Sequence, residues 1–465
     1  MAPNAYSTRN IRGAGGARDR VSRTFAPVLA VPSKRSRPAQ VDALAPLAAW
    51  TVLVVAALVW GTLAVADAGV SWRAAPLMGQ WRGQAGPLLL PVGLGGLAVV
   101  ARGPEVAARL AGRRMVLAGV TGVVAMAWTV GLAAAGGWDR VTAPLTTRHE
   151  YEPFAARVTG IGDLVRGYAG HLAGTPVHVQ GHPPGPVVLA WALDRLGLGG
   201  AGWLAALAVA GWGVAAAAAV WAVGIVAGED AARRAAPVLA VLPAAVWAGT
   251  SLDALFAGVL AVAVALGAAA AVKARTGLAA AAGAVLGVAL LMTYGAAPFV
   301  AIVAALIVVL APADRRGRLL AAVGAGVFVP LAVAAAAGFW WPAGLLATGS
   351  RYWAGVGGTR PALYATVLGN PAALALAVGP AVAVGIVAIG RAARGRAVRA
   401  TLLPAAVLAA VVAADLSQMS RGEVERIWLP FVPWLGLAAP GDRRRLLALQ
   451  VATALLLQST LASPW

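Results

Sequence analysis

The amino-acid sequence predicts an all-α polytopic membrane protein with about 13 transmembrane helices, and three observations favour this fold class. Hydrophobic residues make up 60% of the 465 residues and charged residues only 12%, whereas a soluble domain is usually about a quarter charged. The mean hydropathy is +0.79. Apolar stretches such as 45–66 and 200–227 recur, and roughly 20 apolar residues suffice to cross a bilayer.

The first 40 residues form a separate region. Residues 1–40 are polar, basic and rich in Gly, Pro and Ser, which predicts a disordered cytoplasmic tail, and 41–465 is expected to be the transmembrane domain. The net charge of +20 comes largely from arginines between spans, which indicate topology and no nucleic-acid partner. The chain has no cysteine, which excludes disulfides and thiolate chemistry.

Thirteen segments are expected to cross the lipid bilayer. They are 45–66, 87–101, 115–136, 201–227, 235–249, 254–272, 276–293, 297–312, 319–340, 363–390, 400–414, 428–440 and 446–462. The short apolar segment 184–198 decides the topology. If it dips into the membrane and stays outside, most Lys and Arg residues fall inside, as the positive-inside rule requires. We therefore expect a multi-pass plasma-membrane protein with a cytoplasmic N-terminus and an external C-terminus.

The external loop 137–199, which includes the juxtamembrane helix, contains all four histidines. Long loops in compact proteins are often functional. Glu150 and Glu152 lie one residue apart, and carboxylates in such a loop supply a general base or hold a cation. His182 precedes Pro183 and Pro184, which fix the backbone before the next helix.

The order of these motifs resembles the first external loop of GT-C membrane glycosyltransferases, in the protein O-mannosyltransferase and aminoarabinose transferase branch. The similar motifs are Glu150-Tyr151-Glu152, Gly162-Asp163, His182-Pro183-Pro184, Thr250-Ser251-Leu252-Asp253 and Leu291-Met292-Thr293-Tyr294-Gly295. The resemblance covers about residues 137–312. His149 stands near the position of the family's leading aspartate, and Tyr294 stands where a lysine is common.

The resemblance implies a reaction and a set of partners. Such enzymes of the inverting type move a sugar from a polyprenyl-phosphate donor to an extracytoplasmic glycan or protein acceptor. A carboxylate of the first external loop activates the acceptor hydroxyl, which implies Glu150 or Glu152 as the catalytic base. The same resemblance and the loop positions give the expected substrate-binding residues, which are His149, Tyr151, Asp163, His182, Asp253, Tyr294, Arg421 and Arg426.

Two of these positions have a second interpretation from the residues alone. Asp253 either serves the site or caps the helix that follows it, because Thr250, Ser251 and Asp253 are all cap-forming residues. Arg421 and Arg426 either bind a phosphate, for which the planar guanidinium is suited, or pair with the neighbouring glutamates.

Three other functions compete with sugar transfer. A transporter of a small solute would carry ionisable groups in the middle of its spans and often an internal repeat. The expected spans have almost no ionisable groups in their middles, and the sequence shows no convincing internal repeat. A non-catalytic integral membrane protein is the second alternative. The third is an external divalent-cation site at His178 and His182, although no cofactor is expected for the transferase.

Overall fold

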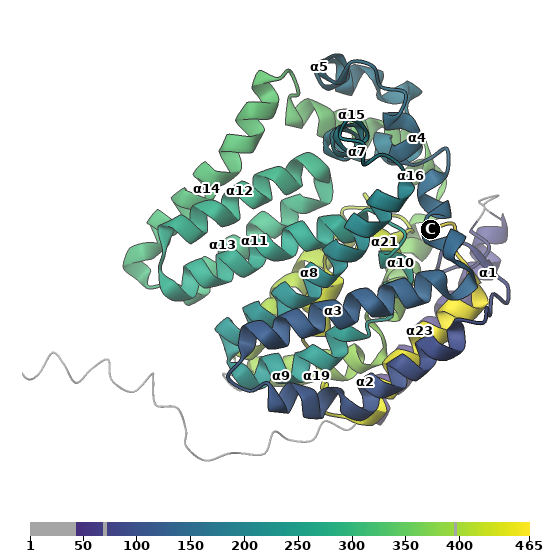
Figure 1. Cartoon of the computed structure of the whole chain (residues 1–465), viewed down its shortest axis with the longest axis vertical. Helices are drawn as coiled ribbons and strands as arrows, with labels where there is room; N and C mark the ends of the chain where they lie inside the picture. The colour runs from purple at the N-terminus through teal and green to yellow at the C-terminus, as the bar shows by residue number, and fades with distance from the viewer. Residues whose placement is uncertain (1–42, 68–71, 395–397) are drawn as a thin grey trace, which may run out of the picture. The chain divides into compact units, whose positions relative to one another are not determined.

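The protein is described by a computed structural model, which covers residues 43–67, 72–394 and 398–465. The predicted tail at 1–40 lies outside the described residues. The described part is mainly helical and has only two strands, of two residues each, which confirms the all-α prediction. The elements are labelled as in Figure 1.

The first part of the chain leads to the long loop. Its elements are α1 (Leu44–Asp67), β1 (Gln80–Trp81), α2 (Leu89–Arg109), α3 (Arg114–Ala133), η1 (Ala134–Gly136), η2 (Trp138–Val141), η3 (Ala143–Thr146), α4 (Tyr151–Ala155), α5 (Ile161–His171), η4 (Leu172–Gly174), α6 (Val177–Gln180) and α7 (Gly185–Arg195).

Longer helices follow in the middle of the chain. They are α8 (Ala201–Ala227), α9 (Glu229–Ala240), α10 (Ala245–Ala248), α11 (Asp253–Lys273), α12 (Thr276–Met292), η5 (Tyr294–Ala296), α13 (Ala297–Leu310), α14 (Ala313–Ala336) and α15 (Trp341–Ala354).

The last part of the chain has several breaks. Its elements are α16 (Val356–Thr359), α17 (Ala362–Tyr364), η6 (Ala365–Gly369), α18 (Asn370–Val378), α19 (Pro380–Arg394), α20 (Val398–Leu416), α21 (Val424–Ile427), α22 (Val432–Gly436), α23 (Arg444–Thr460) and β2 (Leu461–Ala462).

Six helices in the described part are long and apolar enough to cross a membrane, or up to seven if one bent pair counts as a span. The six lie in α1, α2, α3, α8, α11 and α14. The bent pair turns by 103° between Ala362–Val378 and Pro380–Val387. The expected number of thirteen spans is therefore not confirmed.

Two of the expected spans are interrupted by prolines. In 235–249 the helix ends at Ala240 and resumes only as the short α10, and in 428–440 the only helix is the five-residue α22. Proline lacks the amide hydrogen that a helix interior needs. Almost all residues of both segments are buried inside the protein. Irregular backbone at membrane depth is tolerated where protein surrounds it.

Helix α7 has 11 residues and is therefore about 16 Å long at 1.5 Å per residue. Such a helix is too short to cross a hydrocarbon core of about 30 Å. The expectation that 184–198 does not span the membrane agrees with this length.

The long helices approach one another closely where both carry glycine. A Cβ on Gly258 of α11 would lie 2.5 Å from the carbonyl oxygen of Gly211 on α8. A Cβ on Gly326 of α14 would lie 2.2 Å from the carbonyl oxygen of Ala280 on α12. Small residues allow this backbone proximity in membrane proteins, where apolar surface alone gives no preference for helix contact over lipid. Helix α11 lies at the centre of the long helices, and 72% of the residues in its most apolar 18-residue stretch are buried.

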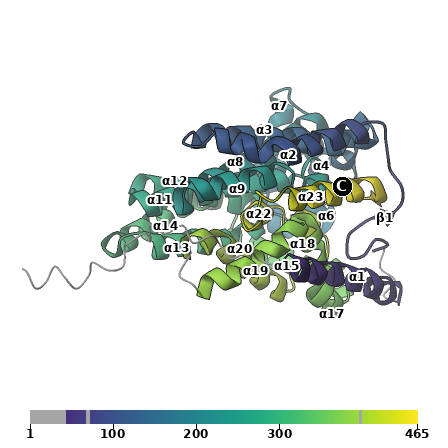
Figure 2. The same ribbon diagram turned by 90° about the horizontal axis from the view of Figure 1, so that it is seen from below.

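Other helices present large apolar side chains outward. Examples on α1, α2 and α14 are Val52, Leu63, Leu90, Leu94, Phe328 and Val333, each more than half exposed. Exposed apolar side chains along helices of this length indicate that lipid covers them. Figure 2 shows α23 between α2 on one side and α19 on the other.

The elements of the long loop gather at one end of the helices. Figure 1 shows α4, α5, α7, α15 and α16 together at one end of α11, α12 and α14. Segments far apart in sequence also meet there: β1 pairs antiparallel with β2, and Arg426 reaches Asp253. Contacts such as Arg114 with Glu229 and Arg444 with Glu105 join loops predicted for the other side.

Candidate functional site

Short helices and prolines hold the long loop in a defined conformation. Glu150 precedes α4 and His178 lies in α6, and the His178 amide donates to the His149 carbonyl at 3.3 Å. The Tyr168 hydroxyl lies 2.8 Å from the carbonyl oxygens of both Val179 and His182. These bonds bring Glu150 and His178 together.

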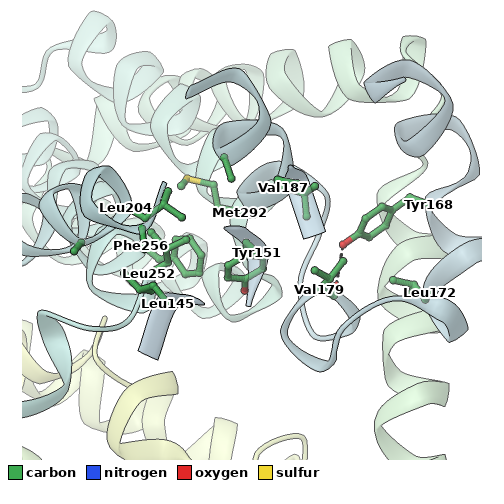
Figure 3. Packing of buried hydrophobic residues seen from close by; sticks show 14 of the residues in the cluster. Leu145, Tyr151, Tyr168, Leu172, Val179, Val187, Leu204, Leu252, Phe256 and Met292 are labelled. Atoms are coloured by element: carbon green, nitrogen blue, oxygen red, sulfur yellow. Dashed lines mark hydrogen bonds between the residues drawn. The ribbon is translucent and has the colours of Figure 1, made fainter. Parts of the chain in front are cut away.

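The side of this loop that faces the long helices is apolar. Figure 3 shows Tyr151 between Leu252 and Phe256 on one side and Val179 and Tyr168 on the other. All five residues are buried. The apolar cluster anchors the loop on the start of α11, because exposing these side chains would cost roughly 1.5–3 kcal/mol each.

Arg426 is the centre of a buried polar cluster. Its Nη1 lies 2.8 Å from Asp253 Oδ2, and its Nη2 lies 2.9 Å from Glu423 Oε2 and 3.1 Å from His178 Nε2. The guanidinium also lies over the ring of Trp465, 4.7 Å from its centre. Burial alone would lower the pKa of Arg426. The carboxylates of Asp253 and Glu423 raise this pKa by more than burial lowers it, so the guanidinium stays charged.

His178 links Arg426 to Glu150. A guanidinium has no acceptor, so His178 Nε2 accepts from Arg426 and the ring proton lies on Nδ1. His178 Nδ1 lies 2.7 Å from Glu150 Oε1, to which it donates. His178 and Glu150 are both buried, with 8% and 6% exposure. The imidazole is therefore held between a cation and a carboxylate as the neutral tautomer with its proton on Nδ1.

His182 lies on the other side of Asp253. Its Nδ1 is 2.9 Å from the carbonyl oxygen of His178 and 2.8 Å from the Tyr151 hydroxyl, and its Nε2 is 4.0 Å from Asp253 Oδ1. Burial lowers the pKa of His182, although Asp253 opposes the shift. Burial and the Asp253 and Glu150 carboxylates raise the pKa of Tyr151. Ser251 Oγ donates to Asp253 Oδ2 at 2.7 Å, so Asp253 accepts from its own helix start and from Arg426.

A second arginine, Arg360, contacts the cluster through Glu423. Arg360 pairs with Glu423, donates to the Arg421 carbonyl at 2.7 Å, and lies over the Trp72 ring at 5.8 Å. Burial raises the pKa of Glu423, but Arg426 and Arg360 outweigh it and lower that pKa to about 2. Glu423 is therefore ionised and bridges both arginines.

Glu425 has a different environment from Glu423. It is fully buried, its Oε1 accepts from the Met78 amide at 2.8 Å, and its Oε2 has no hydrogen-bond partner among the described residues. Burial raises the pKa of Glu425 to about 7. This carboxyl is therefore partly protonated near neutral pH.

The structure brings together five of the ten residues that the sequence indicated for the site, and it puts the others elsewhere. Glu150, Tyr151, His182, Asp253 and Arg426 form the cluster, by the contacts given above. Arg421 adjoins it through Arg360, and its own side-chain contacts within the described part are neutral: Gln418, the Gly357 and Arg360 carbonyls, and the Trp353 ring.

Four expected residues direct their side chains away from the cluster. The His149 ring is exposed, and Asp163 forms an exposed ion pair with Arg166. Glu152 lines a small cavity with Asp194 and Leu204. Tyr294 packs edge to face on Trp341, with 5.5 Å between ring centres. These positions give the four side chains no contact with Arg426.

Three cluster residues had no role in the sequence-based site. His178 was considered only for a cation, Glu423 only as a neighbour with which Arg421 or Arg426 could pair, and Arg360 was not assigned. The spacing of His178 four residues before His182, after Pro176, was a usable signal. Arg360 carried none, because its partners are 61 or more residues away. Among the described residues, no group of three or more His, Asp or Glu side chains has a metal-binding arrangement.

A surface pocket of about 340 Å³ lies on the same loop. It is lined by Arg148, Phe154, Arg157, Val158, Gly174, Thr175 and Pro176. Thr175 and Pro176 directly precede α6, which carries His178. The loop that holds the cluster therefore also presents a basic concave surface.

Neither a protein-family model nor a curated protein matches the sequence.

Proposed function

We propose that this protein is a membrane glycosyltransferase that moves a sugar from a polyprenyl-phosphate donor to an extracytoplasmic glycan or protein acceptor. The observation that carries the proposal is the meeting of Glu150, Asp253 and Arg426 in one buried cluster. They come from three separate segments, each of which the sequence had singled out. Burying charged groups is costly and is common at functional sites in membrane proteins.

The proposal gives each group a task. The Glu150 carboxylate, directly or through His178, activates the acceptor hydroxyl. Arg421 binds the donor phosphate, because its side-chain partners in the described part are neutral and its guanidinium can exchange them for an anion. Trp353 lies beside it, 4.8 Å from the guanidinium to the ring centre, and is 42% exposed, so lipid or sugar can contact its ring.

The position of the cluster favours transfer over transport. Asp253 is the first residue of α11, and Arg426 lies in the short helix α21, so the charges are at helix ends. A secondary transporter binds its solute near the middle of the bilayer, between discontinuous helices. The proposed enzyme lies in the plasma membrane, with its N-terminus in the cytoplasm and the cluster on the external side.

The test begins with the lipid-linked and surface glycans of a strain that lacks this protein. We expect one glycan to lose a sugar and the wild-type chain to restore it. Glu150→Gln should fail to restore it, whereas Glu152→Gln, a matched change two residues away, should succeed. Normal glycans in the deletion strain, or equal behaviour of the two variants, would contradict the proposal. Immunoblots of membrane fractions control for insertion.

A further inference from the structure

We infer that the proton acceptor at this site is His178, and that Glu150 is the residue that positions it. The inference rests on the proposed sugar transfer and deepens it. It replaces a carboxylate base by a Glu–His pair, the arrangement in which a carboxylate orients an imidazole and stabilises its protonated form.

The inference depends on which ring nitrogen of His178 carries the proton. Because Nε2 accepts from Arg426 and Nδ1 donates to Glu150, Nε2 holds a lone pair and no proton. A general base needs such a lone pair within hydrogen-bond reach of the hydroxyl. Glu150 directs Oε1 at the ring, 2.7 Å from Nδ1, so it is already engaged in orienting the histidine.

Arg426 covers the basic nitrogen in this state. Of its three polar contacts, the one to His178 is the longest at 3.1 Å, and those to Asp253 and Glu423 hold the guanidinium independently. A hydroxyl that takes the place of Arg426 Nη2 at His178 Nε2 leaves the ion pair of Nη1 with Asp253 in place. Nη2 also donates to Glu423, which Arg360 holds as well, so the exchange is confined to the Nη2 end of the guanidinium.

His182 is the less suitable of the two buried histidines. Its Nδ1 is near the His178 carbonyl and the Tyr151 hydroxyl, and the only carboxylate in contact is Asp253, 4.0 Å from Nε2. Asp253 accepts from Ser251 and Arg426 through Oδ2, and its Oδ1, at 4.0 Å from His182 Nε2, is beyond hydrogen-bond distance of the ring. His178 alone has a dedicated carboxylate behind it.

The transfer step balances in protons and electrons. The acceptor O–H gives its proton to His178 Nε2, and its oxygen forms a bond to the anomeric carbon of the sugar. The bond from that carbon to the donor phosphate oxygen breaks, and the electron pair stays on the phosphate, which leaves as polyprenyl phosphate. The imidazolium is stabilised by Glu150, and it returns its proton to solvent after the product has left.

Several charged or titratable groups surround His178. The charged or titratable side chains that face it are Glu150, Arg426, Glu423, His182 and Tyr151. Glu423 stays ionised at neutral pH, and Arg426 stays charged. Glu425 titrates in the same range as histidine, so Glu425→Gln is included in the measurement.

The experiment uses the full-length protein in nanodiscs with radiolabelled polyprenyl-phosphate mannose, glucose and arabinose as donor probes. Membranes of the deletion strain serve as acceptor, and the single-turnover transfer rate is measured from pH 5 to 8. We expect His178→Gln to lower the rate by about 10²–10⁴-fold, the usual contribution of a general base, with unchanged donor binding. His171→Ala removes an exposed histidine whose hydrogen bond within the described part of the chain is to the Gly167 carbonyl of its own helix, and should leave the rate unchanged.

The pH profile distinguishes the roles of the two residues. The wild-type rate should fall at acid pH, and His178→Gln should abolish that acid limb. Glu150→Gln should keep only a residual rate, too low to restore the glycan in the deletion strain, and should move the acid limb to lower pH. The amide oxygen still orients the ring but no longer stabilises the imidazolium. Glu425→Gln should leave the limb in place.

The results distinguish a failure of the proposed sugar transfer from a failure of the His178 assignment. If the wild type transfers no sugar from any donor, both the proposed function and the base assignment fall. If the wild type is active and His178→Gln keeps its rate within threefold, or keeps the acid limb, only the assignment of His178 falls. Thermal unfolding shows whether His178→Gln is folded, and His178→Asn replaces it if it is not.

Discussion

Arg426 Nη1 lies 2.8 Å from Asp253 Oδ2, an ion pair between residues 173 positions apart in the sequence. It fixes the last external loop against the start of α11, and through Arg426 it connects to Glu423 and His178. Buried pairs of this kind contribute little net stability, but breaking one side is costly because the remaining charge is left without a partner.

Replacing Arg426 tests this relationship directly. Arg426→Ala leaves Asp253 and Glu423 buried without their central cation, so we expect the free energy of unfolding to fall by about 3–5 kcal/mol. Denaturation of the purified protein in mild detergent measures the change. The control is Arg166→Ala, which breaks an exposed pair with side chains 64% and 83% accessible and should cost less than about 1 kcal/mol. Equal losses in both variants would contradict the structural role of the cluster.

Glu425 predicts a pH dependence of stability. Its pKa in the folded protein is raised from an ordinary 4.5 to about 7, so the folded state binds the proton more tightly than the unfolded state. The stability associated with this proton is fully present below about pH 4.5 and is lost as pH rises through about 7. Glu425→Gln should therefore be more stable than wild type at pH 8, by at most roughly 3 kcal/mol, and similar to it at pH 5.

Glu423 provides the matched control of opposite sign. Its pKa is lowered to about 2, so its contribution to stability is present above the ordinary carboxyl range and is lost as pH falls toward 2. Glu423→Gln should be less stable than wild type at pH 8. The unfolding midpoints of both variants and of wild type are measured at pH 5 and pH 8. A Glu425→Gln protein that is less stable than wild type at pH 8 would refute the explanation by burial.

The close contact between α8 and α11 predicts that one added methyl group destabilises the protein. Gly258→Ala puts a Cβ 2.5 Å from the Gly211 carbonyl oxygen, and backbone on both helices has to move. We expect a lower unfolding midpoint and less protein in the membrane. Gly202→Ala, in α8 with nothing within 4 Å of the new Cβ, should be neutral or slightly stabilising, because alanine favours helix by up to about 1 kcal/mol over glycine. A neutral Gly258→Ala would show that the helices do not pack as described.

The Trp465 ring is expected to limit the access of reagents to His178. Its ring lies 4.7 Å from the Arg426 guanidinium and 6.3 Å from the centre of the His178 ring. Trp465→Ala should make His178 react faster with diethyl pyrocarbonate, as followed site by site with mass spectrometry. The exposed His171 supplies the internal reference, and its rate should not change. An unaltered rate at His178 would mean that the ring does not cover the cluster.

The sequence by itself determined the fold class and most of the participants. Composition and the length of the apolar stretches determine an all-α membrane protein, because backbone groups in lipid have to be satisfied within helices. Asp253 and Arg426 stood out because charges at the ends of apolar segments are conspicuous. The breaks in 235–249 and 428–440 were visible as prolines, but the burial that makes them tolerable was not.

Only the tertiary structure decided which of the two neighbouring glutamates belongs to the cluster. Glu150 precedes α4 and faces His178, whereas Glu152 lies within that helix and faces the cavity beside Asp194. Glu150 has extended backbone, with φ −92° and ψ 169°, so its side chain does not follow the helical direction of Glu152. The partners of His178 and Arg360 were likewise decided by the packing of distant loops at one end of the helices, which no local pattern encodes.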